Sequence, residues 1–212
     1  MKKIILFCAV IICGTLTSHA QVKIDWGGKI GGGLSEYSKL DPGSQISVNY
    51  KTFFAYKAGL ATRITYDYGI FSMFFLETGL LYDKKGSKTE RNMGSLAGAK
   101  IIAEVIYSAH YLTVPVHIGV NLGWIYVNTG LGLSLHLSNS KEMKSLGAGE
   151  FGPKTSVKYN AFNPSFDAGF GFNFSKKISL GLELSLGLSR VFAAESSTSK
   201  IEAFAIVFRY FY

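Results

Sequence analysis

Strict alternation of apolar and polar residues recurs eight times along this chain and constrains its fold more than any other feature. The alternation covers residues 23–34, 53–66, 72–83, 111–120, 124–137, 162–174, 178–188 and 201–212. None of these runs keeps apolar residues at the i, i+3, i+4 and i+7 spacing of an amphipathic helix. Each run therefore predicts a β-strand with one apolar face and one polar face.

The connections between these strands distinguish a transmembrane barrel from a soluble sandwich. Residues 35–52, 84–110, 138–161 and 190–200 form the longer connections, whereas 67–71, 121–123 and 175–177 are short. Bacterial transmembrane barrels have an even number of strands, short periplasmic turns and longer extracellular loops. We therefore predict an all-β fold, an eight-stranded antiparallel up-and-down transmembrane β-barrel in the outer membrane, with both termini in the periplasm.

Strand length and the placement of aromatic residues agree with this prediction. About twelve residues at about 3.3 Å each, tilted by about 40°, span roughly 30 Å, which covers an apolar band about 25 Å tall. Tyr56, Tyr82, Tyr210 and Tyr212 stand near strand ends, where aromatic girdles meet lipid headgroups. The apolar faces are therefore expected to point outward to lipid and the polar faces inward to the lumen.

The first twenty residues have the pattern of a secretory signal peptide. Lys2 and Lys3 precede an apolar run, and Ser18, His19 and Ala20 resemble a cleavage site. We expect a removed segment at 1–20 and a single barrel domain at 21–212. Both cysteines lie in the first segment, and the net charge of +8 falls by two when it leaves. The exported domain is thus expected to be stable without disulfides.

Charged residues on the predicted inward faces are expected to pair, because an eight-stranded barrel is just wide enough for its own side chains and unpaired buried charge is costly. This argument favours a filled lumen over a wide diffusion pore. The predicted lumen network comprises Lys57, Arg63, Glu77, Asp83, Asp167, Glu183 and Arg209.

The last strand, "IEAFAIVFRYFY", places apolar side chains on one face and Arg209 on the other. A lipid-facing Arg at the bilayer midplane would cost about 2–4 kcal/mol, so we expect Arg209 to face the lumen. Phe208, Tyr210 and Tyr212 are expected to face lipid. This terminal aromatic strand also looks like the signal that the barrel-assembly machinery reads.

Four stretches carry a resemblance to a known family: "LETGLLYDKKG" at 76–86, "YLTVP" at 111–115, "YVNTGLGLSL" at 126–135 and "DAGFGFNF" at 167–174. In this order they resemble the PorT-like outer-membrane β-barrel family of Bacteroidetes-type bacteria. Thr113 departs from the acidic residue that the family often has at the third place of "YLTVP". The resemblance implies a barrel fold and an outer-membrane location, and one namesake lineage takes part in a dedicated protein-secretion system.

Pro115 lies inside the fourth predicted strand, although a closed barrel has no edge strand to hold a proline. We expect a local bulge at this position.

The stretch "HLSNS" at 136–140 raises an enzymatic alternative. It resembles the His-x-Ser-Asn stretch of outer-membrane lipid A deacylases, in which the His activates the Ser toward an acyl ester. Strand parity opposes this alternative, because His136 and Ser138 would both face the lumen, away from the lipid ester. A bulge near the strand end could reverse that face. We therefore predict no enzymatic activity.

No cofactor or metal site is predicted. Residues 147–152 match G-x-G-x-x-G, but Pro153 follows and no βαβ unit surrounds them. His110, His117 and His136 lie on separate strands or strand ends, without a Cys or carboxylate at ligand spacing.

Basic residues gather in the long connections and suggest the partners. Lys84, Lys85, Lys88 and Arg91 open the connection 84–110, and four further lysines lie in 138–161. We expect this surface to meet anionic lipopolysaccharide phosphates. No compact basic fold accompanies the charge, so nucleic acid is not an expected partner. The predicted function is a monomeric, non-enzymatic barrel that acts through its extracellular loops in envelope structure or surface interaction; a narrow pore or a secretion accessory are the further alternatives.

Overall fold

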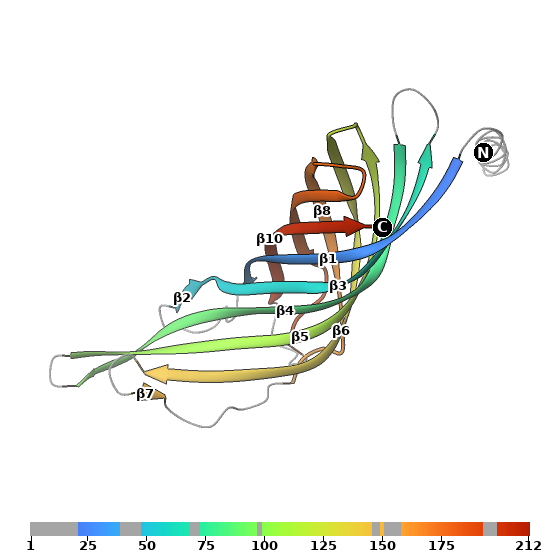
Figure 1. The fold of residues 1–212 in the computed structure, drawn as a ribbon. Coiled ribbons are helices and arrows are strands. Elements are labelled where there is room, and N and C mark those ends of the chain that lie inside the picture. Colours follow the sequence, from blue (N-terminus) through green and yellow to red (C-terminus); the bar gives the residue numbers. More distant parts are fainter. Residues whose placement is uncertain are drawn as a thin grey trace, which may run out of the picture.

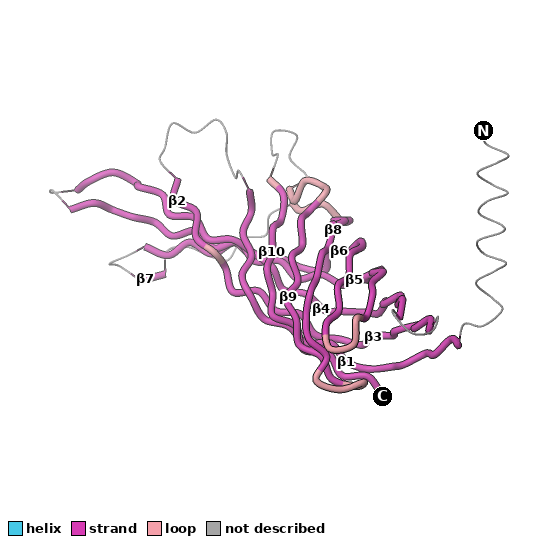
Figure 2. Tube along the Cα trace, turned by 90° about the horizontal axis from the view of Figure 1, so that it is seen from above, coloured by secondary structure: helices cyan, strands magenta, loops and turns pink. Residues whose placement is uncertain are grey.

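The computed structural model describes residues 21–38, 48–67, 73–96, 99–145, 149–150, 158–192 and 199–212. The predicted signal peptide at 1–20 lies outside these ranges. Within them the regular structure is entirely β (Figures 1 and 2). No helix in the described part of the chain is long and apolar enough to cross a membrane.

Eight long strands make up the fold, and each includes the core of one predicted strand. They are β1 (Gln21–Ser38), β3 (Phe53–Asp67), β4 (Met73–Leu96), β5 (Ala99–Asn121), β6 (Ile125–Ser145), β8 (Phe162–Asn173), β9 (Ile178–Gly187) and β10 (Lys200–Phe211). Two short strands, β2 (Val48–Lys51) and β7 (Gly149–Glu150), pair with β4 and β6.

The eight strands form a closed antiparallel ring, which confirms the predicted barrel. Each long strand pairs with its sequence neighbour among the eight, and β1 also pairs with β10. Gly27 lies opposite Phe211 and Ser38 opposite Lys200, so this closing ladder runs almost the full length of β10. Closure removes the sheet edges that would otherwise expose unpaired backbone groups.

Side chains alternate between a buried inward face and an exposed apolar outward face. Along β9, Ser179, Glu183 and Ser185 are buried, while the intervening leucines are exposed. Leu60 on β3 is 72% exposed and Trp26 on β1 is 67% exposed. A continuous exposed apolar belt is unfavourable in water, so the surface of this barrel suits a hydrocarbon environment.

Strands β4, β5 and β6 run well beyond the rest of the barrel, on the side away from the C-terminus (Figure 1). The predicted connection at 84–110 is strand for most of its length, because β4 continues to Leu96 and β5 begins at Ala99. The sequence left residues 99–112 open between an extension of the strand and a short helix, and the structure shows the extension. The loop predicted from 138 likewise begins only after Ser145. Seen from above, β2 and β7 flank this projecting three-stranded sheet (Figure 2).

The ladder is interrupted at Pro115, but the predicted bulge there is wrong. Thr78 pairs with Val116 and Leu81 with Thr113 in one unchanged register, so only the pairs between them are missing. A proline has no N–H to donate, and the sheet accommodates this as a local gap in hydrogen bonding. The bulges lie elsewhere, at His110/Tyr111 in the β5–β6 ladder and at Asn92/Ser95 in the β4–β5 ladder.

Tight turns connect the strands at the opposite end of the barrel. The β5–β6 turn passes through Gly123, whose φ of 78° favours a residue without a Cβ. In the β8–β9 turn, the backbone N–H groups of Lys177 and Ile178 donate to Ser175 Oγ. These turns agree with the short connections predicted from the sequence.

Candidate functional site

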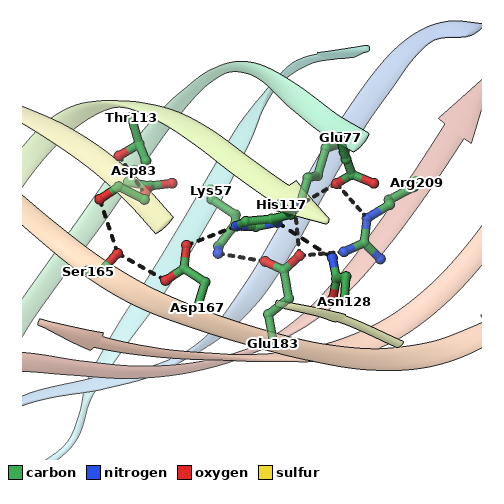
Figure 3. Close-up of polar contacts among 12 residues, drawn as sticks. Lys57, Glu77, Asp83, Thr113, His117, Asn128, Ser165, Asp167, Glu183 and Arg209 are labelled. Atoms are coloured by element: carbon green, nitrogen blue, oxygen red, sulfur yellow. Dashed lines mark hydrogen bonds and ion pairs between the residues drawn. The ribbon is translucent and has the colours of Figure 1, made fainter. Parts of the chain in front are cut away.

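A network of charged side chains fills the barrel (Figure 3). Its members face inward because each occupies the inward parity of its strand. Seven of them belong to the predicted network, and the structure adds Lys29, Lys85 and His117. The ion pairs form three groups: one around Glu77 and Glu183, one of Asp83 with Lys85, and one of Asp167 with His117.

Glu77 on β4 is the first centre of the network and is fully buried. Its Oε1 accepts from Lys29 Nζ at 3.1 Å and from Arg209 Nε at 3.1 Å. Its Oε2 accepts from Arg63 Nη2 at 2.9 Å. Three cations from β1, β3 and β10 thus converge on one carboxylate, which ties three strands to the fourth across the lumen.

Glu183 on β9 is the second centre. Lys29 Nζ lies 2.6 Å from its Oε1, and Lys57 Nζ donates to its Oε2 at 2.9 Å. Arg209 Nη2 also donates to Glu183, and Nη1 of the same guanidinium donates to the Tyr126 hydroxyl. Lys29 and Arg209 therefore bridge the two carboxylates, so that neither charge is buried alone.

Two further carboxylates extend the network toward the projecting sheet. Asp83 Oδ2 accepts from the Thr113 hydroxyl at 2.8 Å and lies 3.3 Å from Lys85 Nζ. Asp167 lies 3.1 Å from His117 Nε2 and accepts from the Ser165 hydroxyl at 2.9 Å. The polar contents of the lumen thus run continuously along the barrel.

Sequence reasoning missed three members of the network. Lys29 and His117 lie on the polar face of their predicted strands, and this position could have identified them as members of the network. Lys85 could not be identified in the same way, because it was assigned to a loop.

The fold also brings together Glu77, His117 and Glu183, whose ligand atoms lie within 4.8 Å of one another. The order of residues along the chain does not indicate this arrangement, since the three residues lie on three strands. Such a cluster could hold a metal ion in principle. Here four cationic side chains already occupy the two carboxylates, and a metal ion would have to displace them. We therefore assign no metal to it.

A cluster of buried hydrophobic residues lies at the mouth of the barrel, on the side where β4, β5 and β6 project (Figure 1). Tyr37 packs edge-on against Phe192, with ring centroids 5.7 Å apart, and its hydroxyl lies 3.4 Å from that of Tyr159. Tyr159 also packs against Phe192, with ring centroids 5.0 Å apart. The whole cluster, termed the aromatic cap, comprises Tyr37, Val105, Tyr107, Ala109, Tyr111, Tyr159, Val191, Phe192 and Ile201.

Aromatic rings around Arg63 narrow the opposite end. The Arg63 guanidinium carbon lies 4.3 Å from the ring centroid of Phe211 and 4.6 Å from that of Phe75. Cation–π contacts of this kind hold a charged group against apolar rings. Two internal voids near Lys85 and Ser185 have volumes of about 10 Å³ each, close to the size of a single water molecule. A larger hollow of about 490 Å³ lies toward the turn end of the barrel, lined mostly by outward-facing residues such as Phe74, Ile118 and Val127.

The structure separates the two residues of the enzymatic alternative. A bulge places Tyr111 opposite His136 but His110 opposite Ser138. His136 points inward and stacks on Tyr159 at 5.0 Å, and its Nε2 lies 3.2 Å from Asn139 Nδ2. Ser138 points outward and is exposed, contrary to the predicted inward parity. The two side chains lie on opposite faces of β6, which does not favour a His–Ser pair.

The remaining predicted residues lie on the outward face or in the short strand β7. Phe208, Tyr210 and Tyr212 at the end of the chain are 39%, 42% and 83% exposed, whereas Arg209 is fully buried. The glycine stretch 147–152 lies outside the described residues except for Gly149 and Glu150, which form β7.

Comparison with known proteins identifies the family. The model of a family described as "Outer membrane protein beta-barrel domain" matches residues 19–193. No relative was found among curated proteins.

Solved structures with some similarity include Ail of Yersinia pestis in complex with the heparin analogue sucrose octasulfate, at 12% identity and a TM-score of 0.39, covering 90% of this chain and 99% of that one. Neisserial surface protein A is similar at 9% identity and a TM-score of 0.34, covering 90% and 98%. OprG of Pseudomonas aeruginosa is similar at 11% identity and a TM-score of 0.29, covering 91% and 95%. These similarities are too weak to carry an argument about function.

Proposed function

This chain belongs to the outer membrane protein β-barrel domain family, and from that premise we propose that it is a closed, non-enzymatic barrel that acts through its outer surface. The barrel anchors the projecting sheet of β4, β5 and β6 at the cell surface, in contact with lipopolysaccharide. The observation that carries the proposal is the filling of the lumen between the aromatic cap and Arg63. A barrel of this kind offers its exterior, rather than its interior, to a partner.

The first test of this proposal is conductance. The barrel, shown to be folded by its mobility shift on unheated gels, is inserted into planar bilayers. We expect no discrete steps, because paired charges and aromatic rings occupy the lumen along its length. A double variant, Tyr37→Ala with Phe192→Ala, removes much of the aromatic cap and is also expected to stay silent, since the network beneath it is intact. Discrete steps from the wild-type barrel would refute the closed lumen.

The second test is orientation. The only cysteines of the chain, Cys8 and Cys13, lie in the predicted signal peptide, so a single introduced cysteine would be a unique label. Lys88→Cys on the projecting sheet is expected to react with a membrane-impermeant maleimide on intact cells. Lys177→Cys in the β8–β9 turn is the matched control and should react only after the outer membrane is broken. The reverse pattern would overturn the proposed surface role.

The finer family assignment is part of the same proposal. The four stretches that resemble PorT-like barrels fall on β4, β5, β6 and β8, with the last extending one residue past its strand. Such a member would be expected to use a cleaved signal peptide, to reach the membrane through the barrel-assembly machinery by way of Phe208, Tyr210 and Tyr212, and to work as a monomer.

A further inference from the structure

A row of polar side chains crosses four strands on the outward face of the barrel. Tyr56 on β3 lies opposite Lys84 on β4, and Lys84 lies opposite His110 on β5. His110 in turn lies opposite Ser138 on β6. These four residues, termed the outer polar row, are direct cross-strand neighbours. Each adjacent pair in the row is about 4.5–5.5 Å apart at Cβ, so Lys84 and His110 in the middle of the row can share one ligand.

The β-bulge at His110/Tyr111 completes the outer polar row. Leu137 has no partner in the ladder, so the parity of β6 reverses beyond it and Ser138 points outward. In an unbulged strand Ser138 would point into the lumen, beside His136. Bulges commonly redirect a side chain next to a functional site. The irregularity thus turns a fourth polar group toward the other three.

Lys84, like Lys141 on β6, is a lysine whose ammonium group lies against aromatic rings. Its Nζ lies 5.6 Å from the ring centroid of Phe53 and 5.9 Å from that of Tyr56, and it forms no ion pair with any described residue. Lys88, four residues along β4, lies 3.9 Å from Glu104. Lys84 is therefore a partly buried cation, held by aromatic rings, without a neutralising carboxylate among the described residues.

His110 is oriented by its own neighbours. The Tyr82 hydroxyl forms a hydrogen bond with His110 Nδ1, and the two rings lie 5.7 Å apart. When the hydroxyl donates, the proton of the neutral imidazole is on Nε2, which remains available as a donor. The Tyr56 ring lies 6.3 Å from that of Tyr82, so both tyrosines stand at the same level.

The outer polar row lies at the boundary of the apolar belt. Directly below it toward the short turns, Leu80, Val114 and Leu135 face outward with exposures of 48%, 37% and 52%. Beyond it, β4 and β5 carry Lys88, Glu90 and Glu104. Tyrosines at such a boundary are typical of the membrane–water interface. A group bound here would sit at headgroup level with its acyl chains against the belt.

We propose that Lys84 and His110, flanked in the row by Tyr56 and Ser138, bind a phosphate group of lipopolysaccharide in the outer leaflet. The acceptor oxygens of a phosphate monoester match the Lys84 ammonium group and the imidazole N–H of His110. This inference rests on the proposed function, because it requires the projecting sheet to be on the cell surface. The apolar belt below the row favours a lipid phosphate over free phosphate, because acyl chains can pack against the belt.

The test uses refolded barrel in detergent micelles with three probes: diphosphorylated lipid A, enzymatically dephosphorylated lipid A, and inorganic phosphate. Binding is measured by native mass spectrometry. Because a hydrogen bond to a charged group is among the stronger ones, we expect Lys84→Gln and His110→Gln each to weaken binding of diphosphorylated lipid A by about tenfold. Lys177→Gln removes the same charge at the opposite end of the barrel, where the Lys177 ammonium also lies against an aromatic ring, and this variant should bind as the wild type does. Dephosphorylated lipid A should bind at least about tenfold more weakly.

Equal binding of the two lipids, or wild-type affinity in both the Lys84 and His110 variants, would overturn the proposal. Binding of inorganic phosphate as strong as that of diphosphorylated lipid A would overturn the lipid source. Lys84→Gln and His110→Gln are both made, so that if one variant fails to fold on unheated gels, the binding measured with the other still tests the proposal. The maleimide experiment tests the surface role separately. If Lys88→Cys reacts only after the outer membrane is broken, the projecting sheet is on the periplasmic side, and the surface role is refuted even if lipid A binds in micelles.

Discussion

Neutralising Glu77 should strongly destabilise the barrel. Its carboxylate accepts from Lys29, Arg63 and Arg209, and its side chain is fully buried. Glu77→Gln keeps the size of the side chain but leaves three buried cations with less compensating charge. Removing one partner of a buried ion pair typically costs about 3–5 kcal/mol, and we expect Glu77→Gln to fall in this range.

The control is an ion pair outside the lumen. Lys51 and Glu90 also form a short ion pair, but the Lys51 side chain is 53% exposed. Glu90→Gln should therefore cost no more than about 1 kcal/mol. Both variants are compared with the wild type by reversible urea unfolding in lipid vesicles, followed by tryptophan fluorescence from Trp26 and Trp124. Equal, small losses of stability in the two variants would refute the conclusion that the network holds the barrel together.

Three further predictions follow from the fold. Gly33→Ala should reduce the yield of folded barrel on unheated gels, because a Cβ at Gly33 would overlap the backbone of Phe204 in the closing ladder, whereas Gly28→Ala has no atom nearer than 3.8 Å and should fold normally. Burial raises the pKa of Tyr159 from 10.0 to about 12, so its stabilisation of the aromatic cap should be complete below pH 10 and lost as the pH rises from 10 to about 12. In a titration of tyrosinate absorbance, Tyr159→Phe should lose a component that titrates near pH 12. An unchanged titration curve would contradict this prediction. Phe75→Ala should lower stability by about 3–5 kcal/mol, since it removes a buried ring that contacts Arg63 and Tyr126; urea unfolding checks it, with Phe74→Ala on the exposed face as the milder control.

Strand parity, together with the alternation of long and short connections, was enough to predict the barrel from the sequence. Because side chains alternate with a period of two, the runs around Leu182 and Phe208 place leucine and phenylalanine on one face and Glu183 and Arg209 on the other. The ring of eight strands and the outer-membrane location are confirmed by the fold and by the family match. The same parity places Lys29 on the inward face, although the predicted network did not include this residue.

Only the tertiary structure decided where the strands end and which charges meet. The pattern past Asp83 weakens because β4, β5 and β6 leave the apolar belt there and stay paired through backbone hydrogen bonds, which carry no sequence signal of their own. The pairing of Glu77 with Arg209 depends on register across the barrel, and the bulge that turns Ser138 outward depends on a single unpaired residue. Parity is a property of one strand and is written in its sequence. Contacts across the lumen are properties of eight strands together, so they appear only once the ring has closed.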